Sequence, residues 1–294
     1  MAAVSETVRA TTWVTTGSRT PVITRAAGYA AMLLAVAAIG VPLAWLLSAA
    51  FKNNPEIYVI PATWIPREPT IQNFARAWNA APFGTFYWNS VVVTTLGTIG
   101  KLITGTLTAY ALVFIQFPER AKSVVFVLIL GALMVPPQVT VVPNFLLMAD
   151  LDWVNTMQAL VIPSIPTAVG TFLLRQAFLG LPREVVDAAR IDGAGHARLL
   201  WSVLLPLALP VLVTFTLLAT EGIWNEFLWP LVITNTASMR TLPLGIFFLL
   251  DQEGNTQWGV VMAGTLFVIM PLIALFLWAQ RHIVEGIAAG AIKG

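Results

Sequence analysis

Residues 181–210 read LPREVVDAARIDGAGHARLLWSVLLPLALP, a charged stretch between two long apolar runs. Pro182 suits the first turn of a helix, because an amide proton at that position would have no partner inside the helix. The charged residues at i, i+4 and i+7 share one face of this helix: Arg183, Asp187 and Arg190. Gly193 then predicts the end of the helix, since glycine adopts backbone conformations that other residues avoid. The stretch therefore predicts a short charged helix followed by a tight turn.

This short helix has two interpretations. It could rest on lipid headgroups as an amphipathic linker between membrane spans. Alternatively, its small side chains at Val185, Ala188 and Ala189 would let the surface of another protein approach closely.

The composition indicates a membrane protein. The chain has 294 residues, of which 57% are hydrophobic and only 10% are charged, whereas about a quarter of the residues of a soluble domain are charged. The absence of cysteine excludes disulfides and thiolate metal sites. The two histidines, His196 and His282, are too far apart in sequence to form a local metal-binding motif.

Six apolar runs predict an all-α, polytopic protein with six transmembrane helices. The predicted spans are residues 26–51, 85–114, 123–148, 154–178, 200–233 and 258–282. We expect residues 26–282 to form one transmembrane domain with an internal loop at 181–198, and residues 1–25 and 283–294 to form tails. Prolines within the spans bend or break helices, and the freed carbonyls need partners in protein or in a water-filled cavity. Broken helices favour a translocation pathway, although prolines are also commoner in membrane helices generally.

The connection at residues 52–83 is rich in proline and aromatic residues. We expect it to be an ordered external loop with a membrane-facing side.

The positions of the sixteen Lys and Arg residues predict the orientation, because positive charge is concentrated on the cytoplasmic side. With the N-terminus inside, eleven are cytoplasmic: Arg9, Arg19, Arg25, Arg120, Lys122, Arg175, Arg183, Arg190, Arg198, Arg281 and Lys293. Four are external, namely Lys52, Arg67, Arg76 and Arg240, and Lys101 lies within a span. We expect both termini and the loop at 181–198 to be cytoplasmic.

Three ionisable residues lie inside predicted spans: Lys101, Glu221 and Glu226. Such groups are costly in a membrane and usually face the protein interior or a cavity. Lys101 and Glu221 could form a structural ion pair. Alternatively, Lys101 offers positive charge to an anionic substrate.

Aromatic and amide groups meet in the fifth predicted span at Trp224, Asn225 and Glu226. Rings that stack on sugar faces and polar groups that bind hydroxyls would suit sugar recognition. An interfacial aromatic belt explains the same residues equally well. Gln138, in the third span, completes the set of candidate substrate-pathway residues.

The sequence contains no recognisable catalytic motif. Gly100-Lys101 does not match a phosphate-binding loop, because Thr95 occupies the position of the first glycine and Leu102 that of the required Ser or Thr. No HExxH, Ser-His-Asp or paired-aspartate arrangement is present. We therefore expect a transport subunit that is not an enzyme, binds no metal or nucleic acid and has no ATP site of its own.

Three motifs resemble the carbohydrate-type branch of bacterial ATP-binding-cassette (ABC) importer permeases. The first is the cytoplasmic "EAA" loop, which is similar to residues 187–194 followed by Leu205-Pro206, with Asp187 in place of the usual Glu. Residues 224–230, WNEFLWP, resemble the W-N-E-F-L-x-P-L block of that branch. Residues 290–294, GAIKG, are similar to the C-terminal G-A-V-K-G of maltose-type permeases.

The resemblance implies a type I ABC importer permease fold in the bacterial cytoplasmic membrane. It implies that the loop is a coupling helix that docks on an ATPase through Arg183, Glu184, Asp187, Ala188, Ala189, Arg190, Asp192, Gly193 and Ala194. The implied partners are a second permease, two ATPase subunits that bind ATP and Mg²⁺, an extracytoplasmic solute-binding protein and membrane lipid.

The resemblance also suggests a substrate. Gly100-Lys101 and residues 171–176 and 253–258 are most similar to permeases for glycerol 3-phosphate or a glycerophosphodiester such as glycerophosphocholine. A neutral sugar of the maltose or trehalose type is the alternative. A different class, a proton-coupled secondary transporter that uses Glu221 or Glu226, would also place carboxylates in spans, but the internal repeat common in that class is not evident.

Overall fold

The computed structural model describes residues 22–250 and 256–291, with side chains described as far as Gln280. These ranges are helical, with no β-strand in them, which confirms the predicted all-α class. The chain forms two compact units, Met1–Leu46 and Leu47–Gly294. Most of the expected N-terminal tail, residues 1–21, lies outside the described residues, as do residues 292–294 of the C-terminal tail.

The described part of the first unit is one apolar helix. Helix α1 (Val22–Ala50) begins four residues before the predicted span and continues into the second unit from Leu47. Its apolar stretch Ala26–Ala50 is long enough to cross a membrane.

In the second unit, two further helices are long and apolar enough to cross a membrane. These are α4 (Phe83–Phe114) and α15 (Trp258–Ala291), which extends well beyond the predicted end at residue 282. Three bent helix pairs each satisfy the same criterion as a pair, so the described chain has three to six candidate spans.

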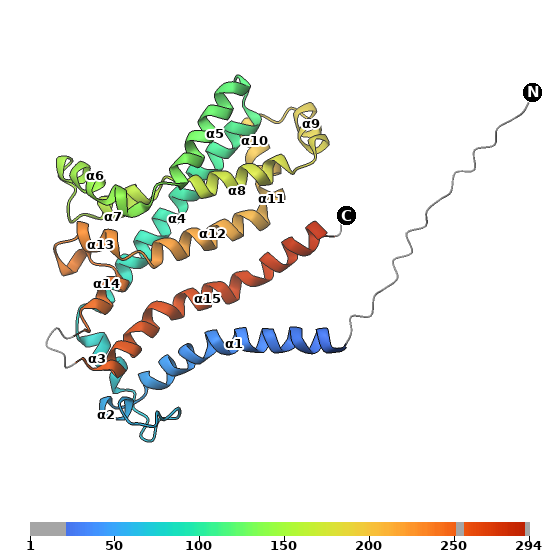
Figure 1. Ribbon diagram of the computed structural model, residues 1–294. Helices are drawn as coiled ribbons and strands as arrows, with labels where there is room; N and C mark the ends of the chain where they lie inside the picture. Colours follow the sequence, from blue (N-terminus) through green and yellow to red (C-terminus); the bar gives the residue numbers. More distant parts are fainter. Residues whose placement is uncertain (1–21, 251–255, 292–294) are drawn as a thin grey trace, which may run out of the picture. The chain divides into compact units, whose positions relative to one another are not determined.

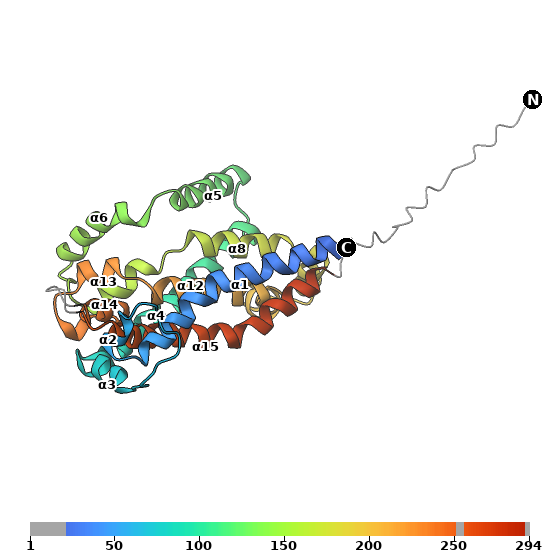
Figure 2. The same ribbon diagram turned by 60° about the horizontal axis from the view of Figure 1, so that its bottom comes forward.

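The third predicted span is broken at its prolines, as their positions predicted. Residues 123–148 fall on α5 (Glu119–Leu133) and α6 (Pro137–Asp150), which meet at 99°. Pro136 and Pro137 cause this break, because neither can donate a backbone hydrogen bond and each disfavours a helical conformation in the residue before it. Figure 1 shows the change of direction between the two helices, and Figure 2 shows them one after the other along one side of the second unit.

The fourth predicted span is also bent, by 41°. It comprises α7 (Met157–Val161), the 3₁₀ turn η1 (Ile162–Ser164) and α8 (Ala168–Leu179). Hydroxyl groups bind the carbonyls that this break frees: Ser164 Oγ donates to Val161 O at 2.8 Å, and Thr104 Oγ1 of α4 donates to Ile165 O at 3.1 Å.

The fifth predicted span, residues 200–233, is divided at both ends. It begins as an arm made of α10 (His196–Leu199), the π-helical turn η2 (Leu200–Leu204) and α11 (Leu205–Leu207). This arm meets α12 (Leu209–Trp224) at 83°, between Pro206 and Pro210. The helix ends at Trp224, and a short α13 (Leu228–Ile233) follows.

The connections carry short helices. The expected external loop contains α2 (Asn54–Ile57) and α3 (Gln72–Asn79), and the expected charged helix is α9 (Arg183–Ile191). The turn η3 (Ala237–Met239) and α14 (Leu242–Phe247) were not predicted.

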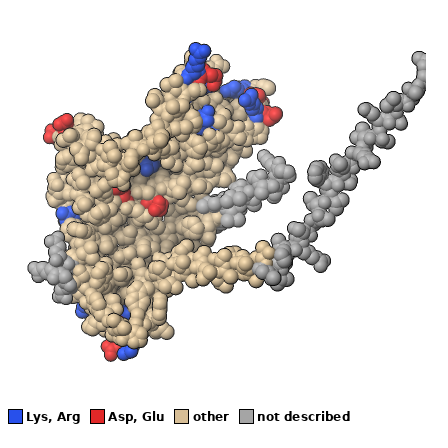
Figure 3. All heavy atoms as spheres, viewed as in Figure 1, with Lys and Arg blue, Asp and Glu red and all other residues tan. Residues whose placement is uncertain are grey.

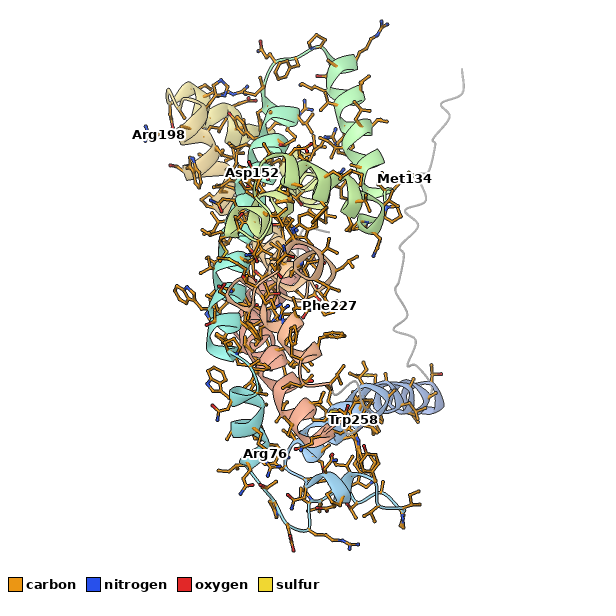
Figure 4. The ribbon with its side chains drawn as sticks, turned by 90° about the vertical axis from the view of Figure 1, so that its left-hand side faces the viewer. Arg76, Met134, Asp152, Arg198, Phe227 and Trp258 are labelled. Carbon is orange, nitrogen blue, oxygen red and sulfur yellow. The ribbon has the colours of Figure 1, made fainter. Side chains whose placement is uncertain are left out.

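Helix α4 is central to the packing of the second unit (Figure 1). It packs against α8 and α12, and α12 also packs against α15. Two glycines allow these helices to pack closely: a Cβ atom at Gly105 of α4 would lie 3.3 Å from the backbone of Gly170 on α8, and one at Gly170 would overlap the ring of Phe215 on α12. Figure 4 shows Arg198 of α10 and Arg76 of α3 near opposite ends of this unit.

Candidate functional sites: the α9 segment and a polar pocket

Helix α9 is attached to the second unit through one face. Val186 is buried, and Ala189 packs beside it in a hydrophobic cluster. The other members of this buried cluster come from four segments: Ala109 and Tyr110 of α4, Leu174 and Phe178 of α8, Leu199, Leu200 and Leu204 of the arm, and Ala208, Phe215 and Ala219. Helix α9 is therefore packed on a core shared with α4, α8 and α12.

The opposite face of α9 is exposed. It includes Glu184, Asp187 and Ala188, and its Ile191 side chain is 86% exposed. From the sequence, Ala189 was expected to share an accessible face with Val185 and Ala188. In the structure it lies on the buried side of α9 instead. Figure 3 shows acidic and basic groups gathered at the end of this unit formed by α5 and α9.

A glycine ends α9, as predicted. Gly193 has φ +78°, its amide donates to Arg190 O at 3.0 Å, and the Ala194 amide donates to Ala189 O at 2.9 Å. This pair of bonds is the Schellman motif, in which the left-handed residue is usually glycine. The Asp192 amide also donates to Ala188 O, so the turn after α9 has a fixed geometry.

A polar contact joins the segment after α9 to α4. Tyr110 is 6% exposed, its hydroxyl lies 2.6 Å from His196 Nδ1, and the two rings meet edge to face. This pair was not predicted from the sequence, because the two residues are 86 positions apart and no local pattern connects them.

A polar pocket of about 400 Å³ lies farther along α4. Its wall comes from α4, α6, the α7–α8 break and the segment around the end of α12. The polar side chains that line it are Lys101, Gln138, Thr140, Asn144, Ser164, Glu226, Trp229 and Thr241.

The predicted ion pair between Lys101 and Glu221 is wrong. Among the described residues, no carboxylate lies within salt-bridge distance of Lys101, and Glu221 instead accepts a hydrogen bond from Asn225 Nδ2 at 2.8 Å. Glu226 lines the pocket with Lys101 and is its electrostatic neighbour. The pocket therefore contains one ammonium and one carboxylate that do not contact each other.

Three of the candidate pathway residues do not line this pocket: Glu221, Trp224 and Asn225. Trp224 is buried elsewhere: its Nε1 donates to Val268 O of α15 at 2.9 Å, and its ring packs on Tyr87. Asn225 caps the end of α12. The aromatic residue of the pocket is Trp229, whose Nε1 donates to Ala159 O at 2.8 Å.

Glycines let other segments approach α4 beside the pocket. A side chain at Gly97 would meet Ile223 and Ser164 at 2.8 Å, and one at Gly100 would meet Ile165 at 2.7 Å. The broken segment between α7 and α8 thus lies directly on α4, next to Lys101.

Several polar residues that line the pocket were not predicted from the sequence. Thr140 and Asn144 are four residues apart on α6, so an i, i+4 polar pair in an apolar segment was a signal for them. No comparable sequence pattern pointed to Thr241. Its Oγ1 is buried without a hydrogen-bond partner in the described chain.

No group of three or more His, Cys, Asp or Glu side chains in the described ranges could hold a metal ion. Among the described residues that line the polar pocket, the ionisable side chains are Lys101 and Glu226.

Comparison with known proteins gives concordant results. Residues 101–288 match the family described as "Binding-protein-dependent transport system inner membrane component". The chain is 36% identical over 263 residues to the sn-glycerol-3-phosphate transport system permease protein UgpE of Yersinia enterocolitica, covering 87% of this chain and 93% of that protein. It is 35% identical over 256 residues to the arabinooligosaccharides transport system permease protein AraQ of Halalkalibacterium halodurans, covering 86% and 91%.

A solved structure has the same fold. A chain of a bacterial ABC transporter involved in the import of the acidic polysaccharide alginate superposes with a TM-score of 0.77, covering 90% of this chain and 98% of that chain at 23% identity. The bent helix pairs described above thus belong to a known permease fold.

Proposed function

The chain belongs to the family of binding-protein-dependent transport system inner membrane components, and we propose that it forms one permease half of a heteromeric ABC importer. A second permease would complete the pathway. Two cytoplasmic ATPase subunits would bind ATP and Mg²⁺ and receive α9. An extracytoplasmic solute-binding protein would deliver the solute.

The geometry of α9 is the observation that carries this proposal. A helix of nine residues, anchored by Val186 and ended by Gly193, holds its carboxylates and Ile191 outward in a fixed position. A partner that moved α9 would act on the cluster shared with α4, α8 and α12. Such an arrangement suits a coupling helix better than a linker that rests on lipid.

The proposed mechanism follows from this arrangement. With both termini and α9 in the cytoplasm, closure of the ATPase subunits on ATP binding would move α9 as a rigid body. The two permeases would then alternate between inward and outward access, with the helix breaks near Pro136 and Pro210 as points of bending.

We propose a phosphate ester as the solute, either glycerol 3-phosphate or a glycerophosphodiester such as glycerophosphocholine. The similarity to UgpE supports this choice. So does the pocket, where Lys101 has no carboxylate within salt-bridge distance among the described residues. Its ammonium would attract the phosphate during passage, and the hydroxyl of Thr241, which has no hydrogen-bond partner among the described residues, would bind a solute oxygen.

A neutral sugar is the second candidate, favoured by the similarity to AraQ and by Trp229 in the pocket wall. The carboxylates Glu221 and Glu226 also fit a proton-coupled transporter. Family membership favours the ABC importer over this last class.

Site-directed cross-linking tests the role of α9 directly, because the chain has no cysteine of its own. A photoactivatable cross-linker on Ile191→Cys is expected to capture an ATPase subunit in membranes from cells that produce the transporter. The same cross-linker on Glu68→Cys, an exposed residue in the loop between α2 and α3, serves as the control. Failure of the Ile191 variant to capture an ATPase would refute the assignment of α9.

A further inference from the structure

A loop beside the end of α1 exposes several large apolar side chains close together in sequence. Residues 57–66, IYVIPATWIP, contain no charged residue. Five large side chains in this loop are exposed: Tyr58 60%, Val59 38%, Ile60 94%, Trp64 53% and Ile65 81%. Contiguous exposed apolar surface of this kind marks an interaction site.

The loop has a fixed shape. Glu56 Oε1 accepts hydrogen bonds from Thr63 Oγ1 at 3.2 Å and from the Arg67 amide at 2.8 Å. This carboxylate therefore ties the two sides of the loop together at its base. The apolar side chains are held outward rather than collapsed on one another.

The same loop folds back along the last turn of α1. Ser48 Oγ, within the helix, donates to the carbonyl of Trp64. Lys52, just beyond the helix, is completely buried, and its ammonium donates to the carbonyl of Thr63. The loop thus encloses the lysine that follows the last turn of α1.

We propose that residues 58–65 insert into the lipid at the outer end of α1. The positions of the charged residues fit insertion into lipid. Glu56, Arg67 and Glu68 lie at the base of the loop, where lipid headgroups would meet them. Tyr58 and Trp64 are the residue types that settle at a membrane interface, and the two isoleucines enter the hydrocarbon. Lipid is favoured over a protein partner because the loop follows directly on the last turn of α1, whose apolar stretch is long enough to cross a membrane, and because residues 57–66 carry no charge.

Environment-sensitive fluorescence tests the proposal. Ile60→Cys, Ile65→Cys and the control Glu68→Cys would each be labelled with the fluorophore NBD in the full chain, purified with its accompanying subunits into phosphatidylcholine nanodiscs. Ile60 is almost fully exposed, so its replacement removes little internal packing, and Ile65 supplies an independent position. Doxyl-labelled lipid is expected to quench both isoleucine positions several-fold more strongly than position 68, and iodide is expected to quench position 68 alone.

Two results would overturn the proposal. Iodide quenching at positions 60 and 65 would place the loop in water. Protection from both quenchers would show that a protein subunit covers it.

Discussion

Tyr110 Oη and His196 Nδ1 lie 2.6 Å apart and join α4 to the arm that follows α9. Tyr110 is nine residues from Lys101, about 14 Å along the same helix at 1.5 Å per residue. Phe114, one turn beyond, packs on both Tyr110 and Phe178 of α8. Helix α4 therefore connects the arm that follows α9 to the polar pocket. Its contact with the arm includes the hydrogen bond between Tyr110 and His196.

We predict that Tyr110→Phe weakens coupling more than it weakens folding. The change removes one hydrogen bond, worth about 1 kcal/mol, and keeps the ring contacts with Phe114 and His196. The number of solute molecules imported per ATP hydrolysed should fall several-fold in proteoliposomes, while the subunits remain assembled. Tyr87→Phe removes a hydroxyl from the other end of α4 that has no hydrogen bond to the described residues, so it is the matched control. An unchanged transport-to-hydrolysis ratio in Tyr110→Phe would refute the prediction.

The turn after α9 can be tested by substituting Gly193, with the same substitution at Gly195 as the matched control. A side chain at either position would meet nothing within 4 Å, but only Gly193 has a positive φ. We expect Gly193→Ala to destabilise the turn by about 1 kcal/mol, because other residues resist the left-handed conformation. ATPase stimulation by the solute-loaded binding protein should fall in Gly193→Ala and stay near wild type in Gly195→Ala. Equal behaviour of the two variants would show that the turn geometry does not matter for coupling.

The crossing of α8 and α12 depends on Gly170. A Cβ atom there would lie 2.0 Å from Phe215 Cζ, so the ring must move. Gly170→Ala should lower the free energy of unfolding by about 1–3 kcal/mol, as overpacking does. Thermal unfolding in detergent measures this, with Gly131→Ala, where a side chain meets nothing, as the control. Phe215→Leu should partly restore the stability of the Gly170→Ala variant, and strictly additive effects would contradict the proposed clash.

Lys101 distinguishes a phosphate-ester carrier from a sugar carrier. An ammonium at mid-membrane costs on the order of 3 kcal/mol, so it must be compensated by a wet cavity, a partner or a passing anion. If it attracts the solute, Lys101→Met should impair phosphate-ester uptake without loss of assembly, and Lys101→Arg should keep part of the uptake. Lys122→Met, at the start of α5, applies the same substitution outside the pocket.

The opposite outcome for Lys101 has a clear signature. If Lys101→Met destabilises the transporter and Glu226→Gln restores it, the two residues form a structural charge pair. The attraction of an anion would then be disproved. Glu221→Gln is the appropriate control, because Glu221 binds Asn225 and does not line the pocket.

The α9 segment was predictable because its signals are local. Pro182, the charged face and Gly193 each constrain the backbone within one or two turns, and the structure has the helix and the left-handed glycine where the sequence placed them. The same holds for the long apolar runs of α1, α4 and α15.

The pocket was only partly predictable. Lys101, Gln138 and Glu226 line it as charged or polar residues in apolar segments. The error concerned the acidic neighbour of Lys101: Glu221 is on α12, whereas Glu226 follows the end of that helix. Which carboxylate faces the pocket depends on the position of the break after Trp224, and that break depends on packing against α15 and on the Glu226 bond to the Trp229 amide at 3.1 Å. Proline positions predicted that helices break, but not the bends of 41°, 83° and 99°.

The most direct test of the account is the energy source for uptake. The complete transporter would be reconstituted in proteoliposomes with the solute-loaded binding protein, with ATP supplied on the α9 side or with a proton gradient alone. The account predicts uptake that requires ATP, persists when a protonophore collapses the gradient, and is lost when the ATPase subunits are omitted. Uptake by this chain driven by the proton gradient without ATP or ATPase subunits would contradict the assignment as an ABC importer permease.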